Sequence, residues 1–301
     1  MKSAYKPSYG ELLREAEERL REAGVPEAQL DAWYILSDTF GISRAEYLWK
    51  RDAGPERIPD IWEERIEGRC RRIPLAYLLG ETEFMGLPFY VRPGVLIPRQ
   101  DTETLVEWVL ERERGGVKGK PLKPSQAKAE AEAGKLLDLC CGTGCIGLSL
   151  AHLGGFGTTL CDISEKAVAL AGENAARLGC KAEIFRGDLF GALPRGAAFD
   201  VIVSNPPYIA SQVIEGLMPE VRDYEPRLAL DGEEDGLAFY RRIAGEAGNY
   251  LLAGGRLYLE IGYDQGQSVP ELLREAGFEQ VEVKKDLAGQ TRVVRGVYSH
   301  V

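Results

Sequence analysis

The chemistry of this chain is concentrated in one short segment, Asn205-Pro206-Pro207-Tyr208. The two prolines fix φ and remove two backbone N–H donors, and the residue before each proline is kept out of the helical region. The segment is therefore a stiff loop that presents two acceptors, the side-chain oxygen of Asn205 and the carbonyl of Pro206. A planar –NH2 group could donate both hydrogens to these acceptors while its nitrogen faces a third direction. Tyr208 offers an apolar face for the rest of such a group.

A second loop has the composition of a cofactor site: Asp138-Leu139-Cys140-Cys141-Gly142-Thr143-Gly144-Cys145. Small residues let a ligand approach the backbone closely, and the helix expected after the loop offers unpaired N–H groups. A phosphate-binding loop would use the same features. However, neither the dinucleotide spacing G-x-G-x-x-G nor the ending GK[ST] is present.

Two acidic residues follow two further expected strands. Asp162 is placed to accept hydrogen bonds from a ribose diol, as in nucleotide-binding α/β folds, and Asp188 with Leu189 could border an adenine. The alternatives are a helix N-cap for Asp162 and a turn residue for Asp188. Together with the glycine loop, these residues indicate an adenosine-bearing ligand that needs no pyrophosphate. S-adenosylmethionine fits, with its aminocarboxylate near the glycine loop and its methyl group toward Asn205.

The cysteines around the second loop invite a metal interpretation. Cys140, Cys141 and Cys145 lie close together in sequence, but the chain holds only two histidines, His152 and His300, and no C-x-x-C pair. A zinc site needs four ligands at defined spacings. We therefore expect no metal, and close packing around the loop as the role of these thiols.

Strands and helices alternate from residue 135 onward, which places these loops. We expect strands at 136–139, 158–161, 182–186, 199–204, 256–261, 281–285 and 291–297, and helices at 146–153, 165–178, 237–252 and 269–276. This order predicts an α/β fold with a seven-stranded, mostly parallel, doubly wound sheet. The last two strands are joined by a loop alone, so one of them should be antiparallel. Ligands bind at the carboxyl ends of strands in such sheets, where Asn205 falls.

The first 80 residues have a different, helical pattern. Ser8 with Glu11 and Ser43 with Glu46 have the spacing of capping boxes, and a fourth helix is expected over 58–72. Three of the four tryptophans (Trp33, Trp49 and Trp62) lie in this region, and a small bundle packed around them is the simplest interpretation. Residues 1–80 are thus predicted to form a helical substrate-recognition domain.

The remaining boundaries follow from composition. Residues 81–98 are predicted to form an interdomain hairpin or linker, with a strand pair at 84–91. Residues 99–301 are predicted to form the cofactor-binding domain, and the acidic residues Asp101 and Glu103 to open its first helix. Residues 112–134, rich in Lys, Ala, Glu and Gly, are predicted to be a flexible insertion.

Overall composition restricts the partners. The 301 residues carry a formal net charge of −10, which disfavours general binding to phosphate backbones. There is no run of 18 apolar residues and no apolar core near the N-terminus, so neither a membrane span nor a secretory signal is expected. Six cysteines, several in apolar segments, suit a reduced, cytoplasmic protein.

Taken together, these motifs resemble the HemK-like N5-glutamine methyltransferases, which modify class I peptide chain release factors. The similarity covers nearly the whole chain, and the run Ile97-Pro98-Arg99-Gln100-Asp101-Thr102-Glu103 is its most specific part, whereas NPPY occurs in many amino-group methyltransferases. Further matching segments are Gly94–Leu96, Asp138–Gly144, Pro74–Gly80, Tyr224–Pro226, Leu228–Leu230, Asp235–Leu237, Asp286–Gly289 and Arg292–Val294.

The resemblance implies an enzyme with S-adenosylmethionine as donor and the glutamine of a Gly-Gly-Gln tripeptide as acceptor. We separately expect a monomer. It implies that the following residues form the site: Cys140, Cys141, Gly142, Thr143 and Gly144 at the methionine end of the cofactor, Asp162 at the ribose, Asp188 and Leu189 at the adenine, Asn205 with Pro206, Pro207 and Tyr208 at the acceptor amide, and Arg99, Thr102 and Glu103 lining the site. There are departures from the family pattern. Cys140 stands where glycine is common, Gln100 where proline is common, and the insertion is longer than usual.

Three other functions remain open at this stage. A ribosomal protein could supply the glutamine, and adenine in nucleic acid presents a similar planar –NH2 group. Base-modifying enzymes usually carry basic, aromatic-rich surfaces, which this acidic chain does not suggest. The chain could also be a non-catalytic adaptor, although the intact Asn205 and glycine loops argue against that.

Overall fold

The computed structural model describes residues 6–113 and 134–299. The chain divides into two compact units. A helical unit contains residues up to Gly80 together with Met218–Tyr224, and a sheet unit contains Glu81–Leu217 and the chain from Glu225 onward. Residues 114–133, most of the predicted insertion, lie outside the described part. No helix among the described residues is both long enough and apolar enough to cross a membrane.

The helical unit begins with helices whose starts are fixed by side chains. Its helices are α1 (Tyr9–Glu22), α2 (Ala28–Phe40), α3 (Arg44–Lys50), α4 (Asp60–Cys70) and α5 (Leu75–Leu79). Both predicted capping boxes are confirmed, with Ser8 and Glu11 bonded reciprocally before α1, and Ser43 and Glu46 before α3. These bonds satisfy backbone donors that a helix start leaves unpaired.

The predicted tryptophan core needs correction. Trp33 and Trp62 are buried in the cluster that joins α1, α2 and α4, but the Trp49 side chain is 71 % exposed. Trp49 therefore lies outside the core, with the Lys50 ammonium 4.8 Å from its ring centroid. The fourth helix is also shorter than predicted, because it begins after Pro59 and Arg72 adopts a positive φ of 67°.

A short segment far along the chain belongs to the helical unit. Glu220, in α9 (Pro219–Arg222), is buried and receives hydrogen bonds from Arg69 Nη2 at 2.9 Å and from Arg72 Nε at 2.6 Å. Arg69 also pairs with Asp31 at 2.6 Å. Charges buried at this depth require such pairing. This segment was expected to belong to the cofactor-binding domain, because nothing in its local sequence indicates a contact with the helical unit.

The sheet unit contains the predicted seven-stranded sheet. Its strands are β3 (Lys135–Leu139), β4 (Gly157–Asp162), β5 (Ala182–Arg186), β6 (Phe199–Ser204), β7 (Leu251–Glu260), β8 (Phe278–Lys285) and β9 (Thr291–Tyr298), in the order β5-β4-β3-β6-β7-β9-β8. β9 alone runs antiparallel to both of its neighbours, as expected for one of the last two strands. From β3 the chain adds β4 and β5 on one side, and it then returns to add the parallel strand β6 on the other side. Sheets of this kind bind ligands at the point where the strand order reverses, here between β3 and β6.

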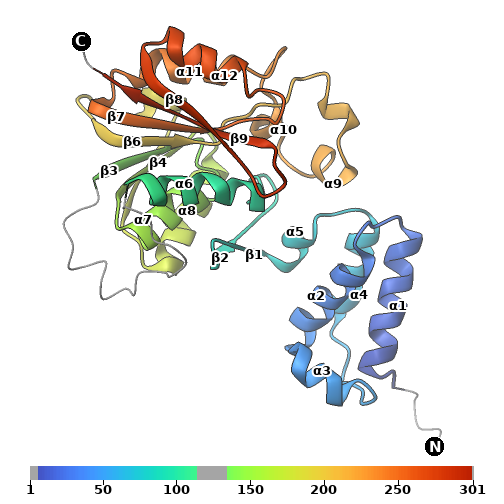
Figure 1. The fold of residues 1–301 in the computed structure, drawn as a ribbon. Coiled ribbons are helices and arrows are strands. Elements are labelled where there is room, and N and C mark those ends of the chain that lie inside the picture. Colours follow the sequence, from blue (N-terminus) through green and yellow to red (C-terminus); the bar gives the residue numbers. More distant parts are fainter. Residues whose placement is uncertain (1–5, 114–133, 300–301) are drawn as a thin grey trace, which may run out of the picture. The chain divides into compact units, whose positions relative to one another are not determined.

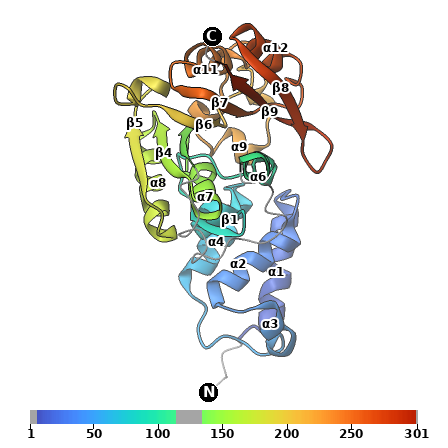
Figure 2. The same cartoon turned by 60° about the vertical axis from the view of Figure 1, so that its left-hand side comes forward.

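Helices cover both faces of this sheet (Figure 1). One face carries α6 (Glu103–Glu113), α7 (Cys145–Gly154) and α8 (Glu165–Leu178), and the other carries α11 (Ala238–Ala247) and α12 (Ser268–Glu275). Figure 2 shows β5 at an edge of the sheet beside α8. Alternate residues of each strand enter opposite cores: Leu136 and Val201 lie in one cluster, Leu137 and Ile202 in the other.

Several predicted element boundaries were wrong. The helix expected over 237–252 ends at Ala247, because Leu251 already pairs with Phe199 as the first residue of β7. Arg112 and Glu113 are the last turn of α6 and not part of an insertion. The sequence also missed α5, α9, α10 (Arg227–Leu230) and the 3-10 turns η1 (Gln100–Thr102), η2 (Leu189–Ala192) and η3 (Ile214–Gly216).

The hairpin before α6 is fastened to the sheet unit. It consists of β1 (Glu81–Phe84) and β2 (Leu87–Tyr90), slightly earlier than the strand pair expected at 84–91. The buried Asn174 of α8 accepts from the Tyr90 N–H at 2.7 Å and donates to the Tyr90 carbonyl at 3.1 Å. The same amide donates to Thr143 O at 2.9 Å, so one side chain connects the hairpin to the glycine loop.

Candidate active site

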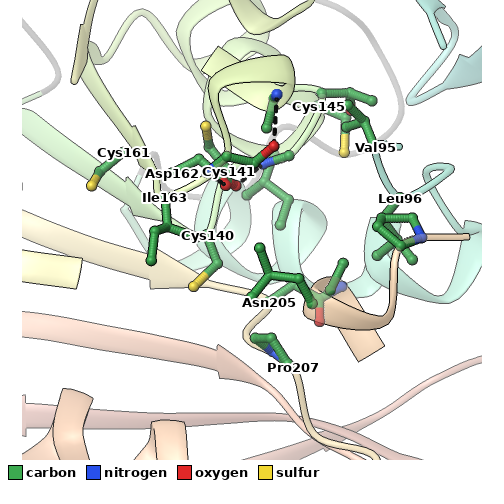
Figure 3. Close-up of a pocket in the computed structure, with 18 of the residues that line it drawn as sticks. Val95, Leu96, Cys140, Cys141, Cys145, Cys161, Asp162, Ile163, Asn205 and Pro207 are labelled. Carbon is green, nitrogen blue, oxygen red and sulfur yellow. Dashed lines mark hydrogen bonds between the residues drawn. The ribbon is translucent and has the colours of Figure 1, made fainter. Parts of the chain in front are cut away.

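A cavity of about 210 Å³ opens at the carboxyl ends of β3, β4 and β6, within the sheet unit. Figure 3 shows Cys140, Asp162 and Asn205 lining it together. The following predicted site residues line it: Cys140, Cys141, Gly142, Thr143, Asp162, Asp188, Leu189, Asn205, Pro207, Arg99 and Thr102. The fold thus brings together side chains that are up to 108 positions apart in the sequence, since Arg99 and Pro207 share this cavity.

The glycine loop follows β3 with three residues in the left-handed region. Cys140 has φ 57°, Gly142 φ 55° and Gly144 φ 78°. Glycine adopts this conformation freely, whereas the Cβ of Cys140 makes the same backbone conformation strained. Cysteine at a position where glycine is common therefore keeps the left-handed turn, with some strain. A Cβ on Gly142 would meet only Val95 Cγ1, at 4.0 Å, so the backbone here is open toward the cavity. Gly144 itself does not line the cavity and is the N-cap of α7.

Asp162 fixes the far side of the glycine loop. Its Oδ2 accepts from the Gly142 N–H at 2.8 Å and its Oδ1 from the Ser164 N–H at 2.9 Å. Burial raises the pKa of Asp162, and these backbone donors oppose that rise. Each carboxylate oxygen retains a further lone pair, so the group can still accept hydrogen bonds from a diol.

The end of the cavity where an adenine was expected is apolar with one ion pair. Leu189 is buried there, with φ 47°, while the exposed Asp188 accepts from Arg242 Nη2 at 2.7 Å. Arg242 belongs to α11 and also lines the cavity, as does Phe239. Asp188 is therefore already paired, and only part of its acceptor capacity faces a ligand.

The Asn205 loop is held by bonds to both sides. Ser204, the last residue of β6, donates its hydroxyl to the Leu139 carbonyl at 2.7 Å, which ties the ends of β6 and β3 together. Asn205 Nδ2 donates to Thr102 Oγ1 at 3.4 Å. Within residues 6–113 and 134–299, no donor bonds to Asn205 Oδ1 or to the Pro206 carbonyl. Neither predicted acceptor is therefore engaged by another group of the described chain, and of the two residues Asn205 lines the cavity.

Three further predicted residues lie outside the cavity lining. Tyr208 packs against the core beside α11, and its carbonyl accepts from Gln265 Nε2 at 3.1 Å. Pro206 is buried and is not among the lining residues. Glu103 faces the hairpin, where its Oε1 accepts from the Met85 N–H at 2.6 Å. Glu103 was expected to line the site, and the structure instead gives it this backbone contact.

One wall of the cavity comes from the segment that precedes α6. Its residues Val95, Leu96, Ile97 and Pro98 supply apolar surface. The buried carboxylate of Glu225 forms an ion pair with Arg99 and accepts from the Ile97 N–H at 3.3 Å. Burial raises the pKa of Glu225, and the guanidinium of Arg99 opposes that rise. Glu225 thus holds the wall in place from outside the cavity.

The thiols are poor metal ligands as they stand. Burial raises the pKa of Cys145 and of Cys161 to about 12, and the pKa of Cys140 and Cys141 also rises. Metal ligation requires the thiolate. The described residues contain no group of three or more His, Cys, Asp or Glu placed to hold a metal ion.

Sequence reasoning missed several residues that shape this cavity. These are Val95, Leu96, Ile97, Ile163, Leu228, Ala229, Phe239 and Arg242. Ile163 offered a signal, since it is an apolar residue directly after Asp162 at the end of a predicted strand. In the structure its side chain is 48 % exposed. Phe239 and Arg242 offered none, because their places on α11 become visible only when that helix is packed beside β6.

The donor set and shape fit an adenosyl ligand. Ile163, Leu189 and Phe239 give apolar surface for a base, Asp162 gives a half-buried acceptor, and the glycine loop leaves its backbone open. The cavity lining contains no lysine, and Arg242, one of its two arginines, is engaged with Asp188. The site therefore suits a nucleoside better than a pyrophosphate.

Comparison with known proteins decides the family. Residues 11–80 match the PrmC N-terminal domain, and residues 125–220 match the Methyltransferase small domain. A release factor glutamine methyltransferase of Fusobacterium nucleatum is 38 % identical over 97 % of this chain and 80 % of its own length. This chain belongs to the release factor glutamine methyltransferase family. A second member, from Geobacter sulfurreducens, is 40 % identical over 92 % of each chain.

Solved structures agree on the fold of the sheet unit of this family member. A methyltransferase from Pyrococcus furiosus superposes with a TM-score of 0.50 at 16 % identity, covering 72 % of this chain and 91 % of its own. A Thermus thermophilus 16S rRNA methyltransferase, solved with AdoMet and guanosine, gives a TM-score of 0.50 at 20 % identity, covering 72 % of this chain and 49 % of its own. These two likenesses confirm the predicted fold of the sheet unit.

Proposed function

We propose that this protein transfers a methyl group from S-adenosylmethionine to the side-chain amide nitrogen of the glutamine in the Gly-Gly-Gln motif of class I peptide chain release factors. One observation carries the proposal: Asn205 presents an unengaged Oδ1 at the cavity while its Nδ2 is held by Thr102. Membership of the family named for this reaction supports it.

The cavity residues divide the work between the two substrates. Cys140, Cys141, Gly142 and Thr143 would surround the methionine end of the cofactor, Asp162 would accept from the ribose, and Leu189 with Asp188 would border the adenine. Bound S-adenosylmethionine supplies an electrophilic methyl group on a positively charged sulfur. Asn205 and Pro206 would hold the glutamine amide, with Pro207, Thr102 and Arg99 shaping the entrance.

The acceptors solve a specific chemical problem. An amide nitrogen is a poor nucleophile because its lone pair is delocalised into the carbonyl. Asn205 Oδ1 and the Pro206 carbonyl would accept its two N–H bonds, favour pyramidal nitrogen and direct the lone pair at the methyl group. Orientation of this kind can contribute about 7–11 kcal/mol to a reaction barrier. In the reaction the N–CH3 bond replaces the S–CH3 bond, and one amide proton is lost.

The same acceptors act on the transition state. Positive charge develops on the amide nitrogen as the methyl group arrives, and fixed oxygen dipoles stabilise it without reorganising. The loop is suited to this because two prolines and the bond to Thr102 restrict its motion. No strong base is required for this arrangement.

The proposal is tested by incubating the protein with labelled S-adenosylmethionine and one of three substrates: a class I release factor, ribosomal protein, or duplex DNA. We expect label only on the release factor, and mass spectrometry should place it on the glutamine of Gly-Gly-Gln. A release factor with alanine in place of that glutamine is the matched control. Label on DNA or on ribosomal protein, with none on the release factor, would refute the assignment.

The finer claims about partners are part of the same proposal. We infer a monomer that recognises its protein substrate through the helical unit, without direct nucleic-acid binding, for which the net charge of −10 is unsuited. A cytoplasmic location agrees with six free cysteines. Deleting residues 1–75 should weaken affinity for the release factor, and unaltered affinity would refute the recognition role.

A further inference from the structure

A buried carboxylate that the proposed reaction does not use lies directly behind the Asn205 loop. Glu260 is the last residue of β7, and its neighbour Leu259 pairs with Ser204 at the end of β6. Glu260 and Asn205 are therefore the adjacent residues at the ends of two parallel strands. Glu260 is only 1 % exposed, and its Oε2 has no hydrogen-bond partner in the described part of the chain.

Two hydroxyl groups of the site face this carboxylate. The side chains of Thr102 and Tyr208 lie close enough to Glu260 to lower the pKa of its carboxyl group by hydrogen bonding. Thr102 is 2 % exposed and also receives the Asn205 Nδ2 donor at 3.4 Å. A buried carboxylate without a full set of donors is costly, so a fold that keeps one here gains something else from it.

Hydrogen-bond counting shows what the carboxylate does. A threonine hydroxyl has one proton to donate. If that proton is donated to ionised Glu260, Thr102 can only accept from Asn205, and the Asn205 amide must turn its NH2 group toward Thr102. Its Oδ1 is then left facing the cavity. Were Thr102 free to donate to Asn205, the amide could flip and present NH2, a donor, to a substrate that also brings a donor.

We propose that Glu260 is a positioning residue that acts through Thr102 to fix the orientation of the Asn205 amide, so that its oxygen faces the acceptor nitrogen. This inference rests on the proposed function of the Asn205 loop. Glu260 touches neither substrate in this account, and its effect is transmitted through the hydroxyl of Thr102.

The charge state of Glu260 makes the device sensitive to pH. Burial raises its pKa to about 7, while Thr102, Arg292 and Tyr208 oppose the rise. Below that pH the protonated carboxyl group of Glu260 can donate to Thr102. The Thr102 proton is then free to be donated to Asn205, and the Asn205 amide is no longer held with its oxygen toward the cavity. The groups that face or influence Glu260 are Arg292 on β9, Asp101 and Thr102 of η1, Tyr208 after β6, Tyr240 on α11 and Cys145 on α7. Arg292 is bonded to Asp101 and Asp286, so its charge is retained throughout.

The test compares full-length variants in release factor methylation and in binding without turnover. Thr102→Val should lower kcat at least tenfold and weaken release factor binding in the presence of S-adenosylhomocysteine, with the affinity for S-adenosylhomocysteine itself within twofold of wild type. Thr102→Ser, which keeps the hydroxyl, should restore both values. An unchanged kcat in Thr102→Val would overturn the proposal.

The pH dependence of kcat distinguishes a positioning role of Glu260 from a purely structural one, because a purely structural role would not change it. Wild-type kcat should fall as the pH is lowered through about 7. This fall should be absent in Glu260→Gln, because the glutamine side chain does not titrate in this range. The same acid limb in Glu260→Gln as in wild type would overturn the proposal. If the wild type methylates no release factor, the proposed function itself is wrong, and the inference about Glu260 is lost with it. If the wild type is active but Glu260→Gln keeps the acid limb, only the inference about Glu260 is wrong.

Discussion

Two neighbouring loops of the active site are held in shape by different means. The loop after β3 owes its course to backbone conformation, with left-handed residues at Cys140, Gly142 and Gly144. The loop after β6 owes its course to prolines and to two side-chain hydrogen bonds, one donated by Asn205 to Thr102 and one donated by Gln265 to the Tyr208 carbonyl. β3 and β6 are paired in the sheet, so both loops start from the same rigid edge. A cofactor needs an open backbone, whereas an amide substrate needs acceptors that do not move.

The two loops should respond differently to mutation. Changes in the loop after β6 should alter the rate of reaction, whereas changes in the loop after β3 and at Asp162 should alter cofactor affinity or stability. The following variants sharpen or break this comparison.

The largest effect is expected from Asn205→Ala. Loss of one preorganised polar group costs about 2.7–4 kcal/mol in the barrier, a fall in kcat of roughly 10²- to 10³-fold. Steady-state kinetics with saturating release factor measures it, and calorimetry with S-adenosylhomocysteine serves as control. If Asn205→Ala bound cofactor poorly but reacted at the wild-type rate, Asn205 would act on cofactor binding, and its predicted role in the reaction would be wrong.

Asp162→Ala should act mainly on binding. Removing a charged acceptor costs about 1.5–3 kcal/mol, or roughly 10- to 150-fold in cofactor affinity. Asp188→Ala is the matched control and should cost less, because Asp188 is exposed and already paired with Arg242. Calorimetry that found equal losses for the two variants would argue against a special role for Asp162.

Gln265→Leu tests how the loop after β6 is anchored. The side chain of Gln265 is buried and bonds to the carbonyls of Tyr208 and Gly236 and to the Gly262 N–H. Leaving these groups unpaired should lower the free energy of unfolding by about 1–3 kcal/mol and reduce kcat. The control Gln267→Leu removes only an exposed contact to Glu271 and should change stability by less than about 0.5 kcal/mol. Equal urea midpoints would exclude the anchoring role.

The smallest effect is expected from Cys140→Gly. Glycine relieves the left-handed strain at φ 57°, and the net gain should be about 1 kcal/mol, raising Tm by about 2–4 °C. Cys141→Gly should instead lower Tm, because Cys141 is buried and is not among the residues with positive φ. Thermal unfolding of both variants measures this. A lower Tm for Cys140→Gly would show that the loop is not strained there.

The sequence predicted what depends on local pattern. Strands 182–186 and 199–204 and helix 165–178 have the predicted limits, since alternating or continuous apolar runs bounded by turn residues are local signals. Helix 237–252 was drawn too long because apolar Leu251 and Leu252 continue the pattern after the helix ends. Trp49 was placed in the core because composition alone does not say which side of a short helix is covered.

The site was predictable to the extent that it lies at strand ends. Asn205, Asp162 and Asp188 follow strands directly, so the fold class alone brings them to one edge. Glu225 and Arg242 could not be assigned in the same way, because they belong to a loop and a helix packed against that edge. Glu260 also ends a strand, but its burial beside Thr102 is visible only in the folded structure. Glu220 shows the limit most clearly, since its segment, Met218–Tyr224, joins a helical unit that otherwise ends at Gly80.

The central claim is that a fixed bend at the end of β6 captures a carboxamide with two acceptors. The most direct measurement is a crystal structure with S-adenosylhomocysteine and a Gly-Gly-Gln peptide. We predict that the two N–H groups of the glutamine amide will lie about 3 Å from Asn205 Oδ1 and from the Pro206 carbonyl. A glutamine side chain bound elsewhere, or an Asn205 amide whose NH2 faced the substrate, would contradict it.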